Sequence, residues 1–312
     1  MAIFYQLDKL PKFKNPVLTI GSFDGVHHGH RVILEKVVSL ARAVKGESIL
    51  ITFYPHPRKI IHPDQPLGLL TAPEEKMKLI TSLGIDHIVV VPFTRDFSML
   101  SAREYVFDFL IKNFHPHTIV LGYDHHFGHN REGNIKHLKD WIGKEVNIAE
   151  IPVQLVDEAS VNSTKIRKAL LSGKVAEAAV MLERPFCFTA TVIHGKKLGR
   201  RLGFPTANLK LNYPDMLLPQ PAIYAVYVEW IGNIYKGMMS IGYRPTVSED
   251  HQLTIEVNIL DFSEDIYGQT LKISFMEYIR EEENFPSLEI LKEQLVNDEK
   301  KTRQLLERLS IP

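Results

Sequence analysis

The first half of the chain alternates short apolar runs with amphipathic helical patterns, and this alternation restricts the possible folds more than any other feature. The apolar runs are VLTI, SILITF, HIVVV, TIVL and VNIAEI, at residues 17–20, 48–53, 87–91, 118–121 and 146–151. Helical periodicity lies between them, at 32–44, 73–83 and 102–114. Strands separated by helices favour a parallel sheet with helices on both faces, and buried parallel strands are continuous apolar runs like these. The first half is therefore predicted to be an α/β domain.

The second half of the chain loses the helical periodicity near residue 185 and becomes rich in β-forming residues. Its runs are separated by turn signals and read FCFTATVIHG, IYAVYVEW, NIYKGMMSIG, LTIEVNIL and TLKISFMEYI. This spacing is typical of an antiparallel sandwich or barrel. An amphipathic segment over 287–309 then predicts a final helix with Ser287 as its N-cap. We therefore predict two domains, residues 1–184 and 185–312, with the boundary beside Pro185.

The charge balance and the cysteine count exclude several classes of protein. The 312 residues contain 37 basic and 37 acidic side chains, so no overall field draws the chain to nucleic acid or to an anionic membrane. Cys187 is the single cysteine, which rules out an intrachain disulfide and a multi-cysteine zinc site. Neither the N-terminal segment nor any later run has the apolar length of a signal peptide or a membrane span. We expect a cytoplasmic protein that binds neither nucleic acid nor membranes.

The stretch GSFDGVHHGH, residues 21–30, lies between the first predicted strand and the first predicted helix. Ligands of parallel sheets bind at the carboxyl ends of the strands, which is where this stretch lies. Its glycines let the backbone approach a ligand, and the N–H groups of a helix start favour an anion. His27 and His30 share one face if the helix begins here. The stretch could serve as an anion, metal or acid/base site, or be an ordinary loop; a zinc site would lack two ligands.

A second polar cluster, VNSTKIRKAL at residues 161–170, follows the last predicted strand of the first domain. Ser163 and Thr164 lie at a predicted helix N-terminus, and Arg167 follows within the first turn. Hydroxyls, helix-start amides and a guanidinium together suit a triphosphate. The alternative is an ordinary capped helix, which needs only one of the two hydroxyls.

The segment HGKKLGRRLGFPTANLK, residues 194–210, combines spaced glycines with lysines and arginines. Such a composition is typical of phosphate binding, although the segment lacks the P-loop pattern. Thr206 and Asn208 carry oxygens that point the same way on an extended segment. These oxygens suit Mg²⁺, which takes few protein ligands together with substrate phosphates. The alternative is a basic turn on a solvated surface.

The order of the first two motifs adds information that neither carries alone. The HxGH pattern at 27–30, with His28 as its variable position, follows the first strand, and S-T-x-I-R at 163–167 follows the last strand of the domain. This pair resembles the adenylyltransferase half of the bacterial bifunctional riboflavin kinase/FAD synthetases. TFYPHPRK at 52–59 and GYDHHFGHNREG at 122–133 resemble further stretches of that family.

The second half resembles the riboflavin kinase module of the same family over nearly its whole length. The pattern G-x-x-x-G-R-x-L-G-F-P-T-A-N carries the resemblance first. It continues in order through IGYRPTV, IEVNILDF, DIYG and YIREEENFPSLEILKEQLVND, at 241–247, 255–262, 265–268 and 278–298. The resemblance therefore spans most of the chain.

The resemblance implies an α/β + β architecture. A Rossmann-like nucleotidyltransferase domain would be followed by an antiparallel riboflavin-kinase β-barrel with a C-terminal helix. The barrel would phosphorylate riboflavin to FMN with ATP, and the first domain would adenylylate FMN with ATP to FAD and pyrophosphate. Mg²⁺ would assist both steps, and the partners would be the small molecules riboflavin, FMN and ATP, bound by a monomer.

The same resemblance implies the residues of both sites. Glu256 would be the general base toward the riboflavin 5′-hydroxyl, and His27 and His30 would neutralise phosphate charge during adenylyl transfer. The ATP and phosphate contacts of the adenylyltransferase would be Gly21, Phe23, Asp24, Gly29, Ser163, Thr164 and Arg167, and its flavin contacts Asp124 and Phe127. The ATP and phosphate contacts of the kinase would be Gly195, Lys196, Gly199, Arg200, Thr206 and Asn208. Its flavin contacts would be Phe204 and Arg280, and its metal ligands Thr206 and Asn208.

One departure from the family lies after Asp124, where His125 and His126 replace the usual aromatic and basic residues. Two other functions stay open on the sequence alone. The chain could be a nucleotidyltransferase with another phosphate acceptor, although such an enzyme has no use for the FPTAN segment. It could also be a flavin- or nucleotide-binding module without catalysis, which would release no pyrophosphate from ATP.

Overall fold

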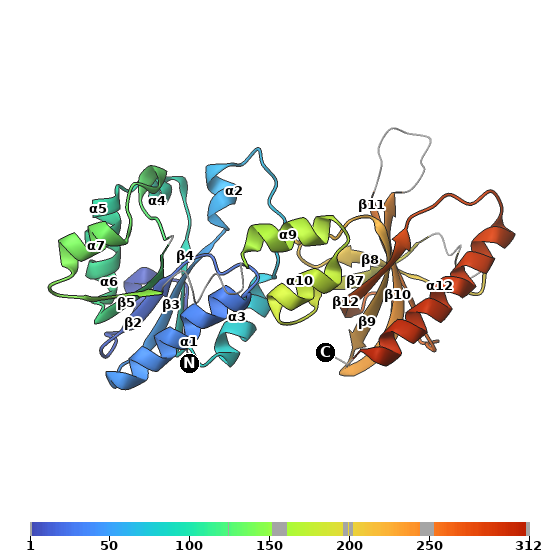
Figure 1. The fold of residues 1–312 in the computed structure, drawn as a ribbon, viewed down its shortest axis with the longest axis horizontal. Helices are drawn as coiled ribbons and strands as arrows, with labels where there is room; N and C mark the ends of the chain where they lie inside the picture. The colour runs from blue at the N-terminus through green and yellow to red at the C-terminus, as the bar shows by residue number, and fades with distance from the viewer. Residues whose placement is uncertain are drawn as a thin grey trace. The chain divides into compact units, whose positions relative to one another are not determined.

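The computed structural model describes residues 2–123, 125–151, 161–195, 199, 202–243 and 253–309. Its contacts divide the chain into two compact units, Met1–Leu67 with Pro73–Asn162 and Gly68–Ala72 with Ser163–Pro312 (Figure 1). The segment 163–184, which the sequence assigns to the first domain, lies in the second unit by these contacts. The boundary at 184/185, which concerns the functional modules, stays a prediction.

The first unit is built on a parallel six-stranded sheet in the order β1-β4-β3-β2-β5-β6. Its strands are β1 (Ala2–Phe4), β2 (Val17–Ile20), β3 (Ser48–Tyr54), β4 (His87–Pro92), β5 (Thr118–Gly122) and β6 (Asn147–Ile151). Its helices include α1 (His28–Ala43), α2 (Pro57–Ile61), α3 (Pro73–Ser82), α4 (Arg95–Ser98), α5 (Ala102–Glu104), α6 (Lys112–Phe114) and α7 (Ile135–Ile142). A π-helical segment, Tyr105–Ile111, joins α5 to α6, so residues 102–114 form one continuous helix.

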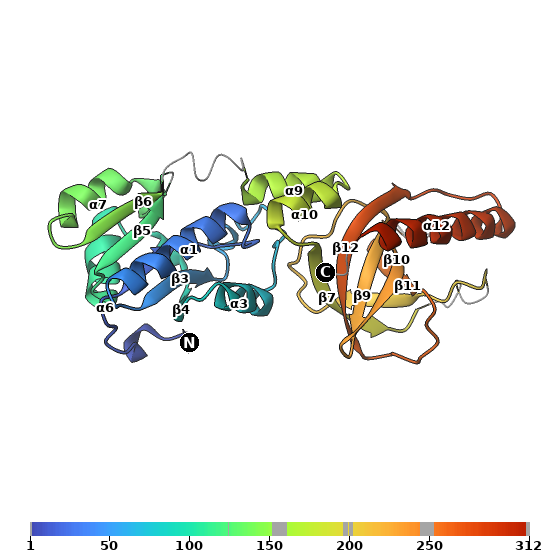
Figure 2. The ribbon, with the colours of Figure 1, turned by 60° about the horizontal axis from the view of Figure 1, so that its bottom comes forward.

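Alternate residues of the strands pack into two apolar layers, one on each face of this sheet. Along β3, Ile49 and Ile51 pack with the 102–114 helix and α7, while Leu50 packs with α1 and α3. Figures 1 and 2 show these two groups of helices on opposite faces. The strands are thus buried on both faces, which is why each is a continuous apolar run. The strand order reverses between β2 and β5, the point at which a ligand crevice forms in sheets of this kind.

The second unit contains a closed antiparallel barrel in the strand order β10-β11-β8-β7-β12-β9. Its strands are β7 (Phe186–Ile193), β8 (Ala207–Leu211), β9 (Ala222–Trp230), β10 (Asn233–Tyr243), β11 (Leu253–Ile259) and β12 (Thr270–Glu281). Large side chains such as Tyr224, Phe186 and Phe275 are fully buried in its core. Closure pairs the outer strands with each other and so removes the exposed edges of an open sheet.

Helices α9 (Ser163–Leu171), α10 (Val175–Leu182) and α12 (Leu288–Arg308) accompany the barrel in the second unit. The helix α12 packs across β9, β10 and β12 on the outside of the barrel. As the sequence predicts, Ser287 is its N-cap, and its hydroxyl accepts a hydrogen bond from the Ile290 amide at 3.3 Å. The helices α9 and α10 pack on each other, and α10 packs against β7 and β12.

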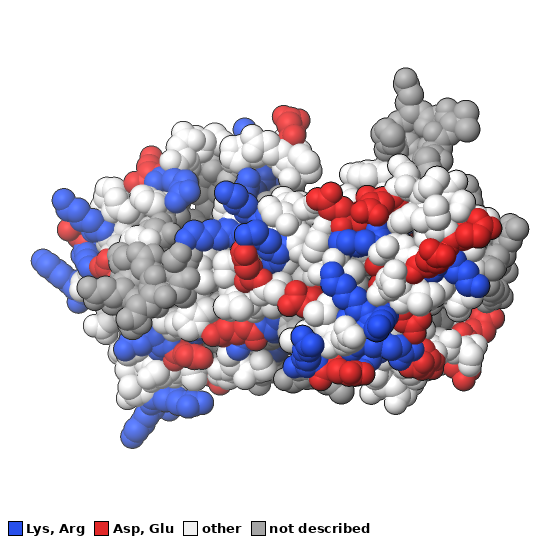
Figure 3. Space-filling view, turned by 45° about the vertical axis from the view of Figure 1, so that its right-hand side comes forward, with Lys and Arg blue, Asp and Glu red and all other residues white. Residues whose placement is uncertain are grey.

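The structure confirms the predicted fold class in both halves. The unpredicted strands are β1 and β8, which are only three and five residues long. The helix α1 begins at His28 rather than at residue 32, because the histidine motif itself forms the first turn. Of the helices in the described ranges, none combines the length and apolar character that a membrane crossing needs. Basic and acidic side chains lie close together over much of the face in Figure 3.

Candidate functional site

The loop from Gly21 to His27 joins β2 to α1 where the strand order of the sheet reverses. Within it, Phe23, Gly25 and Val26 have φ angles of 48°, 93° and 41°. The left-handed region is costly for residues that carry a side chain, above all for β-branched valine. Phe23 and Val26 are both buried, so packing in the core holds the loop in this strained conformation. Strain of this kind is common at functional sites.

The rings of His27 and His30 stack on each other, with centroids 3.6 Å apart and planes at 19°. His27 directly precedes α1 and His30 lies in its first turn, so the two side chains share a face. The Nδ1 atom of His30 is buried and has no hydrogen-bond partner among the described residues. Burial, together with the neighbouring His27 and Lys76, holds the pKa of His30 well below its ordinary value. The pair therefore presents a neutral imidazole that can still bond a ligand.

The carbonyl of Ser22 is the point at which the rest of the unit holds this loop. The Thr52 hydroxyl donates to it at 3.2 Å and the Lys76 ammonium at 3.1 Å. Lys76 also donates to the Thr52 hydroxyl at 3.2 Å. A side chain at Gly21 would lie 3.0 Å from the Phe23 ring, so this position favours glycine. The loop is thus fixed from both its backbone and its side chains.

The other predicted phosphate contacts of the first domain lie in two places. Asp24 and Gly29 are buried within the loop and the first turn of α1. Ser163, Thr164 and Arg167 lie on α9, in the second unit, where the Arg167 Nε donates to the Gly68 carbonyl at 2.9 Å. Because the histidines and α9 belong to different units, their pairing around one triphosphate stays a prediction.

The predicted flavin contacts of the first domain follow β5. Asp124 lies outside the described residues. Phe127 is 6% exposed, and its backbone pairs with Gly133 through hydrogen bonds of 3.0 and 2.9 Å. The Phe127 ring stacks on Tyr105, with centroids 5.4 Å apart. Phe127 therefore anchors the loop in the core, and a contact between its ring and flavin stays a prediction.

Thr206 lines two cavities of about 430 Å³ each among the described residues of the barrel. Volumes of this size are typical of small-molecule sites. Along β11, Glu256 and Asn258 line one cavity, whereas Val257 and Ile259 line the other. Because successive residues of a strand point to opposite faces, the cavities lie on the two faces of β11. We call the first the helix cavity, since residues of α12 line it, and the second the loop cavity, since residues 262–267 line it.

Oxygen-bearing side chains converge in the helix cavity beside Thr206. The Thr206 hydroxyl donates to the Glu256 carboxylate at 2.9 Å, and Asn208 pairs directly with Glu256 across β8 and β11. The Asn258 amide donates to the Pro205 carbonyl at 2.7 Å and so fixes the turn that carries Thr206. A hydroxyl, an amide and a carboxylate form a donor set that suits Mg²⁺. The described ranges contain no group of three or more His, Cys, Asp or Glu side chains that could hold a metal.

The glycine-rich segment before β8 passes close to these donors. A side chain at Gly195 would lie 2.2 Å from the Asn208 amide nitrogen, so only glycine leaves room there. The Gly199 carbonyl accepts a hydrogen bond from the Phe204 amide at 2.9 Å, and both residues line the helix cavity. Lys196 and Arg200 lie outside the described residues.

Arg280 lines the helix cavity and is held there by α12. Its Nε and Nη2 atoms donate to the Asp298 carboxylate at 2.8–3.1 Å, and the Gln294 amide donates to the same carboxylate at 2.8 Å. Asp298 is 2% exposed, so the acidic partner of this ion pair is almost wholly removed from water. The guanidinium carbon lies 5.4 Å from the centroid of the Phe285 ring. The cavity thus combines a fixed positive charge with apolar walls.

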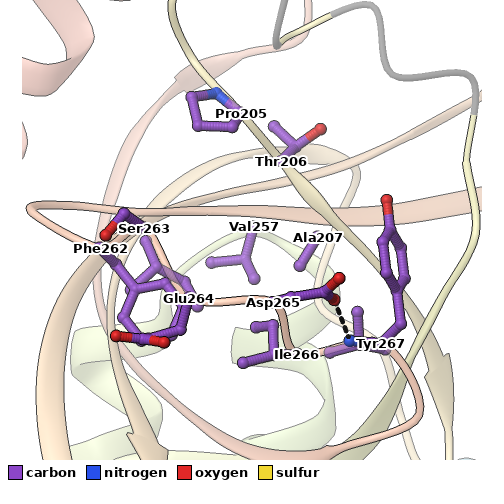
Figure 4. Close-up of a pocket in the computed structure, with 12 residues that line it drawn as sticks. Pro205, Thr206, Ala207, Val257, Phe262, Ser263, Glu264, Asp265, Ile266 and Tyr267 are labelled. Atoms are coloured by element: carbon purple, nitrogen blue, oxygen red, sulfur yellow. Dashed lines mark hydrogen bonds between the residues drawn. The ribbon is translucent and has the colours of Figure 1, made fainter.

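The loop cavity, shown in Figure 4, is a slot between aromatic side chains, lined by apolar residues together with Thr206, Ser263, Glu264 and Asp265. Its floor includes Val257, and the rings of Phe262 and Tyr267 lie on either side. The Tyr267 amide donates to the Asp265 carboxylate at 3.2 Å, and the Tyr267 ring lies 4.1 Å from that of His194. A flat aromatic heterocycle fits such a slot.

Several residues of these sites are absent from the sequence-based expectation. The sequence does contain a sign that Lys76 is buried. It lies one turn before the buried Ile80 on α3, and so on the apolar face of an amphipathic helix. Asn258 could also have been found, because it follows Glu256 at the strand period of two and so lies on the same face of β11. No sequence pattern points to Asp298, because its importance depends on an ion pair with a residue in another element.

Comparisons with known proteins match each half of the chain to a family model and nearly the whole chain to curated relatives. Residues 10–168 match the FAD synthetase family model, and residues 182–306 match the riboflavin kinase model. A bifunctional riboflavin kinase/FMN adenylyltransferase of Listeria monocytogenes is 36% identical over 95% of this chain and 94% of its own length. Proteins with the same name from Bacillus subtilis (90% of both chains) and Escherichia coli K12 (92% of both) are each 35% identical. A crystal structure titled macrolide-efflux protein from Streptococcus pneumoniae aligns with a TM-score of 0.86 at 31% identity, over 97% of this chain and 98% of that one.

Proposed function

The chain belongs to the family of bifunctional riboflavin kinase/FMN adenylyltransferases, and from that premise we propose how its residues divide the two reactions. It is an enzyme that phosphorylates riboflavin to FMN with ATP and adenylylates FMN to FAD. The parallel-sheet half matches the FAD synthetase model and the barrel half matches the riboflavin kinase model. Each half therefore needs its own set of side chains to bind ATP and a flavin.

In the kinase, riboflavin occupies the helix cavity and ATP the loop cavity, with the transferred phosphoryl group passing at Thr206. The observation that carries this assignment is that Thr206 lines both cavities and bonds Glu256 at 2.9 Å. The aromatic slot of Phe262 and Tyr267 suits adenine. The helix cavity offers apolar walls and the held guanidinium of Arg280, which suit the isoalloxazine and its polar edge.

Glu256 is the group that accepts the proton of the riboflavin 5′-hydroxyl. The hydroxyl oxygen forms a bond to the γ-phosphorus of ATP while the bond from that phosphorus to the bridging oxygen breaks, which releases ADP. The transition state of phosphoryl transfer is loose, so the position of the carboxylate matters more than its basicity. The hydrogen bond from Thr206 and the pairing of β11 with β8 supply that position.

The oxygens of Thr206 and Asn208 are the protein ligands that would hold Mg²⁺ in the kinase site. Their donor set fits this ion, and bound Mg²⁺ neutralises charge on the phosphates. Gly195 lets the backbone lie against the Asn208 amide, and Asn258 fixes the turn before Thr206. Both contacts hold the two donors in place.

In the adenylyltransferase, the FMN phosphate is already an anion, so no strong base is required. The stacked His27 and His30 and the amides at the start of α1 bond the α-phosphate and the departing pyrophosphate of ATP. Burial keeps the pKa of His30 low, so the free site presents hydrogen bonds rather than a full charge. Ser163, Thr164 and Arg167 would complete the triphosphate site.

The test of these assignments separates the two products. The purified protein is incubated with Mg-ATP and either riboflavin or FMN, and the flavins are resolved by chromatography while pyrophosphate is measured. We expect FMN and then FAD from riboflavin, and FAD with equimolar pyrophosphate from FMN. Chelation of Mg²⁺ should stop both reactions. Absence of both products in the presence of Mg²⁺ would overturn the proposal.

We also propose that the protein works as a monomer in the cytoplasm. A single cysteine and a reaction that consumes ATP both fit that compartment. Light scattering across a range of concentrations tests the monomer, and a mass of two or more chains would contradict it.

A further inference from the structure

Lys76 lies on the buried face of α3 rather than on its solvent side. Ile80, one turn later on the same helix, is 0% exposed. The Lys76 ammonium donates to the Ser22 carbonyl at 3.1 Å and to the Thr52 hydroxyl at 3.2 Å. Thr52, a fully buried residue of β3, donates to the same carbonyl at 3.2 Å. These three groups form a closed triangle that connects α3, β3 and the loop after β2.

We propose that Lys76 is a positioning residue for FMN adenylylation: it fixes the Ser22 carbonyl and thereby holds the loop that carries His27 and His30. The inference rests on the proposed function of the two histidines. Lys76 lies outside both the HxGH and the S-T-x-I-R stretches, so neither motif assigns it a role.

The conformation of the loop explains why such an anchor is needed. Ser22 directly precedes Phe23, and both Phe23 and Val26 have positive φ angles that a free loop would leave. Strained residues persist only where the surroundings over-determine them. Core packing holds their side chains, and the hydrogen bonds to Ser22 hold the backbone that leads into them. Without the ammonium, the carbonyl keeps only the Thr52 hydroxyl as a side-chain donor among the described residues.

The charge of Lys76 adds a second effect on the same site. Its ammonium lies near the Asp24 carboxylate and acts on His30, which is also in contact with His27. Burial lowers the pKa of Lys76 to about 8, while Asp24 opposes the shift, so the ammonium is mostly charged at pH 7. That charge helps to keep the His30 ring neutral. Removal of Lys76 should therefore change both the geometry and the protonation of the histidine pair.

The test compares K76M and K76R with K78M, which removes an exposed lysine from the same helix. For K76M we expect the kcat of FAD formation to fall about 100-fold, as misplacement of reacting groups does, with a smaller change in the KM for FMN. Riboflavin phosphorylation by the same molecule should stay within about twofold, a range far below the loss expected from misplacement. K76R should recover part of the loss, and K78M should behave as the unchanged protein does.

A spectroscopic measurement separates positioning from a general loss of packing. Titration of the His30 imidazole by NMR should show a higher pKa in K76M than in K78M, because a positive charge has been removed. T52V, which removes one hydroxyl of the triangle and keeps the charge, should lower the kcat of FAD formation and leave FMN formation unchanged. It decides the question if K76M does not fold.

The outcomes distinguish this inference from the function it rests on. If H30A abolishes FAD formation while K76M and T52V keep the full kcat, the role of Lys76 is wrong and the histidine assignment stands. If H30A itself keeps full FAD formation, the proposed adenylyltransferase site is wrong.

Discussion

His27 and His30 lie face to face, with ring centroids 3.6 Å apart, at the start of the helix that follows the central strand. Two imidazoles at this distance cannot both carry a proton without strong repulsion. Burial and the nearby Lys76 act in the same direction on His30. His30 is therefore neutral in the absence of nucleotide, and the phosphates of ATP would be the groups that favour its protonation.

The first prediction concerns stability against pH. The pKa of His30 is lower in the folded protein than in the unfolded chain, where it is about 6.5. Below that pH the unfolded chain binds more protons than the folded one. The free energy of unfolding of the first unit therefore decreases as the pH is lowered through this range. The slope is at most about 1.4 kcal/mol per pH unit for one proton.

Urea unfolding between pH 8 and 5 measures this slope. Trp141 reports on the first unit once Trp230 in the barrel is replaced by Phe. H30N should flatten the dependence relative to H62N, which removes an exposed histidine of the same unit. Equal slopes for the two variants would show that His30 does not carry the effect.

The second prediction is that His27 and His30 are needed for FAD formation, whereas His28 between them is not. H27A and H30A should each lower FAD formation from FMN by at least about 100-fold, the usual loss when a donor to transition-state charge is removed. H28A, at the variable position of the motif, should change the rate by less than about threefold, because its ring is not part of the stack. FMN formation should be unchanged in all three. A loss of both activities in a folded H30A protein would contradict the division of labour.

The third prediction concerns Glu256. E256Q keeps the shape of the side chain but removes the proton acceptor, so FMN formation should fall about 100- to 10,000-fold, the range for loss of general-base catalysis. FAD formation from added FMN should persist. E229Q offers a matched control, since Glu229 is an exposed carboxylate on another strand of the same barrel. An E256Q protein with undiminished FMN formation would mean that another group accepts the proton.

The fourth prediction concerns the ion pair beneath the helix cavity. D298N leaves the Arg280 charge without its buried partner, and we expect the barrel to lose about 3 kcal/mol of unfolding free energy. The KM for riboflavin should rise as well, because Arg280 lines the cavity. Urea unfolding followed by Trp230 fluorescence in a W141F background measures the loss. D261N, which breaks an exposed pair with Arg303, should lose much less stability, and equal losses would contradict the prediction.

The architecture could be predicted from local patterns because most elements carry a strong period of their own. The strand of residues 17–20 and the cap at Ser287 are found where the sequence places them. The strands that were missed, β1 and β8, are too short to show a period of their own, and they pair with β4 and with β7 and β11. Their formation depends on partners that are distant in the sequence, which a local pattern does not contain.

The candidate sites were predictable only in part for the same reason. Motifs locate Thr206 and Glu256 separately, but only the closed barrel places their side chains in contact. The sequence likewise contains Arg280 and Asp298 without showing that they form an ion pair. Lys76 lies in an ordinary amphipathic helix, and its contact with Ser22 depends on how that helix packs on the sheet.

The position of Thr206 between the two cavities of the barrel has a consequence for ligand design. A single molecule that joins adenosine to a flavin through a phosphate chain could fill both cavities at once. Once one end is bound, the other is held at a high effective concentration, so the length of the link would control affinity as strongly as either end. A chain too short to pass Thr206 would reduce such a molecule to the affinity of one half.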